Sequence, residues 1–179
     1  RGHCHALPAK LLPAMARAVT KRTKLVFVCN PNNPTGTSVG ARDFAAFVEA
    51  LPRDLVLAID EAYFEFVRRE DFPDAIALVA RRPGTIVLRT FSKIYGLAGL
   101  RIGYGVADRE LAGYLQRARH PFNVNRLAEV AGLAALDDDD TMRRQVARCI
   151  DARESMRADL ESAGLRCLPG HANFVCVDA

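Results

Sequence analysis

The sequence predicts an α/β protein with a mostly parallel, doubly wound sheet and helices on both faces. Four apolar runs, rich in β-branched residues, begin near residues 25, 55, 86 and 102. Segments with helical spacing of apolar residues separate most of them, which is the alternation typical of βαβ units. Polar or glycine-rich turns follow the first three runs. Right-handed crossovers would bring these turns to one edge of the sheet, where open α/β sheets bind ligands.

The first half of the chain supplies three of these strands. Apolar residues three and four apart predict helices at 7–19, interrupted by Pro13, at 42–51, ended by Pro52, and at 75–80. Continuous apolar runs of strand length predict strands at 24–29, 55–59 and 85–88. Such runs are typical of strands that are buried on both faces of a parallel sheet.

The second half is mostly helical. A further strand is expected at 101–106, and helices are expected at 108–118, with Asp108 as its cap, at 125–136 and at 141–162. Four aspartates, at 137–140, should form a solvated hinge whose last members cap the final helix. Short strands at 165–168 and 173–177 complete the prediction.

Composition excludes several classes of protein. The chain has 179 residues, 50% hydrophobic and 26% charged, which suits a globular protein with one good core. The net charge of +4 comes from cations scattered among acids, which argues against a nucleic-acid partner. No apolar run approaches the ~20 residues that span a bilayer, so no membrane partner is expected. Five cysteines without metal-ligand spacing favour a reducing cytoplasm and no metal site.

The stretch Thr85–Tyr104 carries the strongest chemical signal. Its apolar strand ends in Thr90, Ser92 and Lys93, and a turn with two glycines leads to Arg101. Hydroxyls and a guanidinium so close together can bind a phosphate. A lysine in a desolvated pocket near another cation can act as a neutral nucleophile and form a Schiff base with an aldehyde. The alternative is a strand end whose lysine is merely solvated.

Two upstream turns are also candidates for binding. The turn Asn30–Gly36 places asparagines between prolines, which excludes helix and presents their amides from a stiff loop. The strand 55–59 delivers Asp60 and Glu61 to its end, and a buried acid needs a cation nearby. These asparagines could instead form hydrogen bonds only to the backbone of their own turn. Asp60 could be a helix cap or the ion-pair partner of an arginine with a purely structural role. We expect Glu61 to be a structural or surface acid.

Three motifs together resemble those of the fold-type I, pyridoxal-phosphate-dependent aminotransferases of class I and II. They are Asn-Pro-Asn-Asn-Pro-Thr-Gly (30–36), Ile-Asp-Glu-Ala-Tyr (59–63) and Ser-Lys-Ile-Tyr-Gly-Leu-Ala-Gly-Leu-Arg-Ile-Gly-Tyr (92–104). The segment His-Pro-Phe-Asn-Val-Asn at 120–125 most resembles the histidinol-phosphate aminotransferases within this family. The resemblance covers nearly the whole chain and implies that family's large domain.

The resemblance also implies roles for individual residues. Lys93 would hold the cofactor pyridoxal 5'-phosphate and carry the substrate's α-proton. Asp60 would face the pyridine nitrogen, and Asn33 and Tyr63 would contact the 3-hydroxyl oxygen of the ring. The remaining cofactor-binding residues would be Thr90, Ser92 and Arg101.

The resemblance divides the chain into three parts: an incomplete cofactor-binding domain (1–121), interdomain helices (122–163) and the start of a smaller α+β domain (164–179). The family's members are about twice as long, so we expect an internal segment that is inactive alone. The implied substrates are histidinol phosphate, as the amino donor, and 2-oxoglutarate, and the implied pathway is histidine biosynthesis. The implied assembly is a cytoplasmic homodimer.

Three alternatives remain open at this point. An aromatic-amino-acid aminotransferase and a threonine-phosphate decarboxylase share all three motifs. A chain without catalytic activity could also serve only as a scaffold for a partner.

Overall fold

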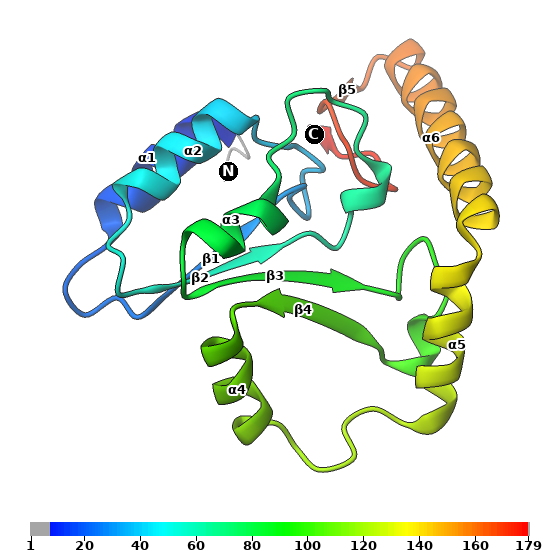
Figure 1. Cartoon of the computed structure of the whole chain (residues 1–179). Helices are drawn as coiled ribbons and strands as arrows, with labels where there is room; N and C mark the ends of the chain where they lie inside the picture. Colours follow the sequence, from blue (N-terminus) through cyan, green and yellow to red (C-terminus); the bar gives the residue numbers. More distant parts are fainter. Residues whose placement is uncertain (1–7, 179) are drawn as a thin grey trace.

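A four-stranded sheet in the order β1–β2–β3–β4 organises the computed structural model, which describes residues 8–178 (Figure 1). Its strands are β1 (Leu25–Cys29), β2 (Val56–Asp60), β3 (Thr85–Thr90) and β4 (Gly103–Ala107). The first three are parallel and β4 runs antiparallel to β3. The predicted α/β architecture with a mostly parallel sheet is therefore confirmed, and the carboxyl ends of β1, β2 and β3 meet at one edge.

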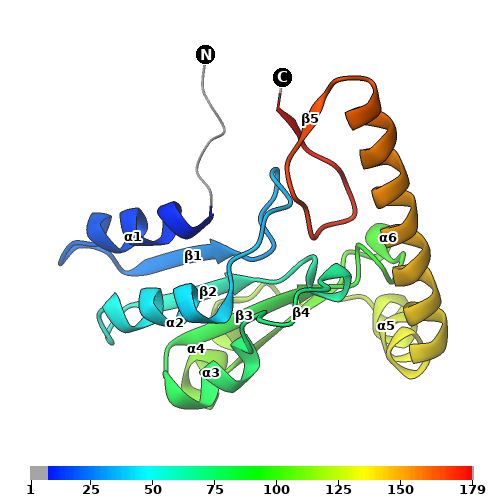
Figure 2. The same ribbon diagram turned by 90° about the horizontal axis from the view of Figure 1, so that it is seen from above.

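The core lies between the sheet and three helices: α1 (Pro8–Ala18), α2 (Ala41–Ala50) and α3 (Ala75–Arg81). Figure 2 shows these helices beside the strands in a second view. Alternate residues along each strand point to the same face of a sheet, and here one face packs on the helices. The buried strand residues of this core are Val26, Val28, Leu57, Ile59 and Val87.

The opposite face of β1 is open. Leu25 is 45% exposed and Phe27 is 57% exposed, so the prediction that this strand is buried on both faces is wrong for this chain. The physical reason is that α1, α2 and α3 all pack on the other face, although helices were expected on both. An apolar strand face is thus left in contact with solvent.

Side chains cap the amino ends of all three helices of the second half. The side chain of Asp108 accepts hydrogen bonds from the first turn of α4 (Arg109–Ala118). Asn125 does the same for α5 (Arg126–Asp137), and Asp138 does so for α6 (Asp139–Ser162). The aspartate run is exposed and caps α6, as the sequence predicts, but the capping residue is Asp138 and not one of the last members, so α6 begins two residues before its predicted start. Figure 1 shows α5 and α6 standing beyond the carboxyl end of β3.

The last two strands are shorter than predicted. A two-stranded antiparallel sheet joins β5 (Arg166–Cys167) to β6 (Val177–Asp178). Most of the expected strand at 173–177 is irregular because the segment before β6 bends onto the turn 30–36, where the His171 amide donates to the Gly36 carbonyl at 2.7 Å. Two 3₁₀ turns, η1 (Phe64–Phe66) and η2 (Ala98–Leu100), were not predicted.

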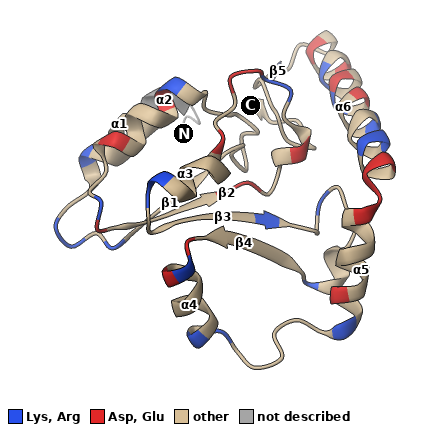
Figure 3. Cartoon of the chain, viewed as in Figure 1, with Lys and Arg blue, Asp and Glu red and all other residues tan. Residues whose placement is uncertain are grey.

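Charges are distributed over the helices and loops rather than collected on one element (Figure 3). The long helix α6 carries both signs, with Arg143 paired to Asp139 and Arg157 paired to Glu154. Within the described chain, no helix combines the length and apolar character that crossing a bilayer requires. The described residues contain no group of three potential metal ligands. The potential ligands His3, Cys4 and His5 lie outside the described part of the chain.

The most buried carboxylate of the sheet edge is Glu61, which is 1% exposed. Its Oε2 accepts hydrogen bonds from Nε and Nη2 of Arg89 at 2.9 and 2.8 Å. The Arg89 guanidinium also lies 3.8 Å from the centre of the Phe64 ring. Burial raises the pKa of the Glu61 carboxyl, and the Arg89 guanidinium opposes this rise. Glu61 is thus a structural acid, as expected, and its partner comes from β3.

We expect Arg89→Met to destabilise the protein by about 3–5 kcal/mol, because it leaves a buried carboxylate without its cation. The pKa of Glu61 should then rise further above its unfolded value. The variant therefore loses stability as the pH rises from the unfolded pKa of Glu61 towards the raised pKa in the folded state. The difference in unfolding free energy between the variant and the unmodified protein should be larger at about pH 8 than at about pH 5. Urea denaturation at both pH values measures this. Adding Glu61→Leu should restore most of the loss; equal stability of both variants would contradict the argument.

Candidate active site

The turn Asn30–Gly36 is held rigid by two of its three asparagines. Asn30 is 1% exposed, and its side chain exchanges hydrogen bonds with the backbone of Val39. Asn32 donates to the hydroxyl of Thr35 at 2.9 Å, and its carbonyl accepts from the Gly36 amide at 2.7 Å. These contacts satisfy the turn itself, so only Asn33 remains available to reach another element.

Asn33 reaches across to Tyr63, which lies in the turn between β2 and η1. Its Nδ2 donates to the hydroxyl oxygen of Tyr63 at 2.8 Å, from a position 30 residues away in the sequence. The Tyr63 ring is 5% exposed, and its centre lies 5.1 Å from Nζ of Lys93. A cation at this distance over an aromatic face is attracted by the ring. The structure thus brings one residue of each predicted motif into a single cluster.

Asp60 ends β2 on the same edge of the sheet. It is half-buried, and its Oδ1 accepts a hydrogen bond from the Ala62 amide at 3.0 Å. Its Oδ2 lies 4.0 Å from Sγ of Cys29 at the end of β1. Burial and the Asp60 carboxylate raise the pKa of the Cys29 thiol. The ion pairs among the described residues do not include Asp60.

The residues proposed to bind phosphate are only partly assembled. Thr90 accepts a hydrogen bond from the Ser92 amide at 3.0 Å, which ties the end of β3 to the turn that follows. Arg101 is exposed, adopts a left-handed backbone with φ of 55°, and donates to the Ala98 carbonyl at 2.6 Å. The hydrogen bonds of the described chain do not join Arg101 to Thr90 or Ser92. This left-handed residue also explains why β4 begins at Gly103, after the predicted start.

Lys93 is exposed in this chain, contrary to the desolvated pocket expected for it. It borders an open cavity of about 560 Å³ between the turn 93–96 and the helices α5 and α6. Asp138, Thr141, Gln145 and Asn173 supply polar groups to its wall. Asn33, Asp60 and Tyr63 do not line it. The amine of Lys93 therefore stands between this cavity and the cluster of Asn33 and Tyr63.

The family model for aminotransferase class I and II matches residues 6–179. The chain belongs to this aminotransferase family. Histidinol-phosphate aminotransferase from Moorella thermoacetica is 49% identical over 93% of the chain and 44% of its own length. Histidinol-phosphate aminotransferase 1 from Nitrosococcus oceani is 46% identical over 97% of the chain and 48% of its own length. The chain thus spans about half the length of these curated relatives.

Solved aminotransferase structures show the same fold. The crystal structure of histidinol-phosphate aminotransferase from Sinorhizobium meliloti in complex with pyridoxal-5'-phosphate matches with a TM-score of 0.84 and 37% identity. The match covers 94% of this chain and 45% of that one. The crystal structure of L-threonine-O-3-phosphate decarboxylase from Porphyromonas gingivalis matches with a TM-score of 0.70 and 24% identity, over 92% of this chain and 51% of that one. At this identity the match supports a shared fold and not a shared reaction. The predicted resemblance to the aminotransferase family is confirmed.

One neighbour of the cluster was not predicted. Phe174 and Tyr63 meet in an edge-to-face contact, with ring centres 5.4 Å apart and planes at 87°. The sequence places Phe174 in an apolar run that indicated only a strand. No local signal marks this contact, because it depends on how the segment 168–176 folds back onto the turn 30–36.

Proposed function

We propose that the whole protein is a pyridoxal-phosphate-dependent aminotransferase that transfers the amino group of histidinol phosphate to 2-oxoglutarate. Relatives of this name, at 46% to 49% identity, support the substrate. The observation that carries the proposal is the joining of Asn33, Tyr63 and Lys93 in one cluster, with Asp60 at the end of the neighbouring strand. Residues 1–121 would form the cofactor-binding domain, 122–163 the interdomain helices and 164–179 the start of the small domain.

The side chains at this edge fit pyridoxal phosphate by their chemistry. A carboxylate suits a protonated pyridine nitrogen, and an amide and a phenol suit the oxygen on the ring. Hydroxyls and a guanidinium suit a phosphate. A primary amine suits the aldehyde. The residues that would supply these groups are Asp60, Asn33, Tyr63, Thr90, Ser92, Arg101 and Lys93.

The side chains of the site would have different tasks in the reaction. When bound, the cofactor supplies a protonated ring that withdraws electrons from the bond broken at the substrate's α-carbon. Asp60 would keep the proton on the ring nitrogen. Asn33 and Tyr63 would orient the ring through its oxygen. Lys93 would hold the aldehyde carbon until the substrate's amine displaces it, and the freed amine would then carry the proton from and to the α-carbon as general base and acid.

Partners and location belong to the same proposal. We expect a homodimer in the cytoplasm, as the family resemblance implies, and size-exclusion chromatography with light scattering would measure the assembly. The 179-residue chain alone should be inactive, since it spans less than half the length of its curated relatives.

The substrate is tested by comparing three amino donors with the purified whole protein and 2-oxoglutarate. We expect kcat/KM for histidinol phosphate to exceed that for phenylalanine by about 100-fold or more, the order that pocket contacts supply. Threonine phosphate should release no carbon dioxide. Faster transfer from phenylalanine, or decarboxylation of threonine phosphate, would replace histidinol phosphate as the substrate while leaving the cofactor chemistry intact.

A further inference from the structure

The segment between β5 and β6 packs closely against the turn that carries Asn33. The His171 amide donates to the Gly36 carbonyl at 2.7 Å. Gly36 has φ of +72°, and a Cβ there would lie 3.2 Å from the Cα of Gly170. Glycine at position 36 therefore allows the two backbones to approach without a side chain between them.

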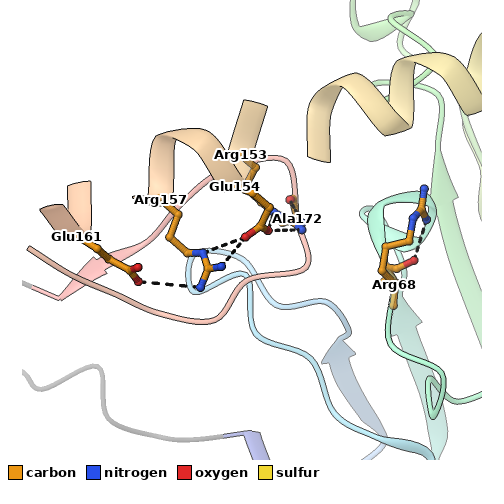
Figure 4. A network of polar contacts seen from close by, with 7 residues as sticks. Arg68, Arg153, Glu154, Arg157, Glu161 and Ala172 are labelled. Atoms are coloured by element: carbon orange, nitrogen blue, oxygen red, sulfur yellow. Dashed lines mark hydrogen bonds and ion pairs between the residues drawn. The ribbon is translucent and has the colours of Figure 1, made fainter. Parts of the chain in front are cut away.

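Helix α6 holds the same segment from the other side (Figure 4). Nη1 of Arg153 donates to the Ala172 carbonyl at 2.9 Å. Glu154 pairs with Arg153 at 2.8 Å and with Arg157 at 2.6 Å, and so keeps the Arg153 side chain in place. Arg153 is only 9% exposed and Ala172 only 1%. The segment is thus fixed between the long helix and the turn 30–36.

These contacts on both sides of the segment place the ring of Phe174 at the candidate active site. The edge-to-face contact with Tyr63 is a favoured geometry for two aromatic rings. Tyr63 receives the hydrogen bond of Asn33 at its hydroxyl and faces Lys93 with its ring. One ring therefore links the small-domain segment to two residues that we propose bind the cofactor.

We propose that Phe174 is a positioning residue for the cofactor site. Its ring packs against Tyr63 and holds that side chain in one position and orientation, so that the hydroxyl stays in reach of Asn33 and the ring face stays over Lys93. Without the Phe174 ring the Tyr63 side chain can shift and rotate, and both contacts are lost together. The role in cofactor binding rests on the proposed function, whereas the fixing of Tyr63 does not.

The first measurement needs no cofactor. Whole protein labelled with 3-fluorotyrosine gives a fluorine resonance for Tyr63, assigned by its loss in Tyr63→Phe. Phe174→Leu, which keeps apolar volume but removes the aromatic ring, should shift or broaden that resonance. Phe174→Tyr, which restores the ring, should leave it near its original position. An unchanged resonance in Phe174→Leu would overturn the proposal.

The second measurement follows pyridoxal phosphate binding by absorbance. Phe174→Leu should raise Kd about 5- to 10-fold, the order expected for one aromatic contact, while Phe174→Tyr should not. Val175→Ala, a loss of half-buried apolar volume on the same segment, is the matched control and should change Kd less than about twofold. In a Tyr63→Ala background, Phe174→Leu should have no further effect.

The outcomes separate this inference from the proposed function. An equal loss from Phe174→Leu with and without Tyr63 would show that Phe174 acts through general folding, and would overturn the positioning role. A protein that binds no pyridoxal phosphate but shows the fluorine shift would overturn the proposed function and keep the fixing of Tyr63.

Discussion

Replacing Lys93 by alanine in the whole protein is expected to reduce amino-group transfer by at least about 10⁴-fold, the upper contribution of general acid–base catalysis alone. The variant loses both the amine that holds the aldehyde and the base that takes the α-proton. Cofactor binding should persist more weakly, because the other side chains of the site remain. Single-turnover absorbance kinetics with histidinol phosphate would measure the loss.

The chain offers matched controls for this experiment. Besides Lys93 it contains three lysines, Lys10, Lys21 and Lys24. Lys24 directly precedes β1, at the end of the sheet opposite to the candidate site, and is exposed. Lys24→Ala should leave turnover unchanged. Borohydride reduction followed by peptide mapping should place the pyridoxyl label on Lys93, and a label on Lys10, Lys21 or Lys24 would refute the assignment.

The strands of the sheet and the polar turns after them could be predicted because their signals are local. Each continuous apolar run ends at polar residues that lead into a turn, and these marks identify β1, β2 and β3 without knowledge of any contact. The meeting of Asn33, Tyr63 and Lys93 then follows from topology, since parallel neighbours bring their carboxyl ends to one edge. The geometry among those three side chains needed the structure.

Features that depend on distant neighbours could not be predicted. The run from Leu25 to Cys29 looks buried on both faces, but the exposure of Phe27 depends on which elements cover the second face. Glu61 required a cation on grounds of burial, yet its sequence context did not identify Arg89 among 25 lysines and arginines. The bend that brings Phe174 to Tyr63 is likewise a tertiary contact, which overrides the strand preference of its apolar run.

Asp60→Asn in the whole protein is expected to lower kcat roughly 1,000-fold, the order found when a group that stabilises developing charge is removed. An amide is uncharged and cannot balance a protonated pyridine nitrogen, so the electron-withdrawing ring would be lost while the shape of the site is kept. Binding of histidinol phosphate should change much less than kcat. The cofactor absorbance should also shift, which gives a readout that is independent of turnover.

Asp54 provides the comparison for this variant, because it lies just before β2, at the opposite end of the strand from Asp60, and is exposed. Asp54→Asn removes the same charge from the turn before the same strand without approaching Asn33, Tyr63 or Lys93, so its kcat should equal that of the unmodified protein. Asp60→Glu retains a carboxylate and should recover part of the lost rate. Near-normal turnover in Asp60→Asn would remove Asp60 from the reaction. It would then be left with the role that its hydrogen bond to the Ala62 amide already gives it, that of closing the turn after β2.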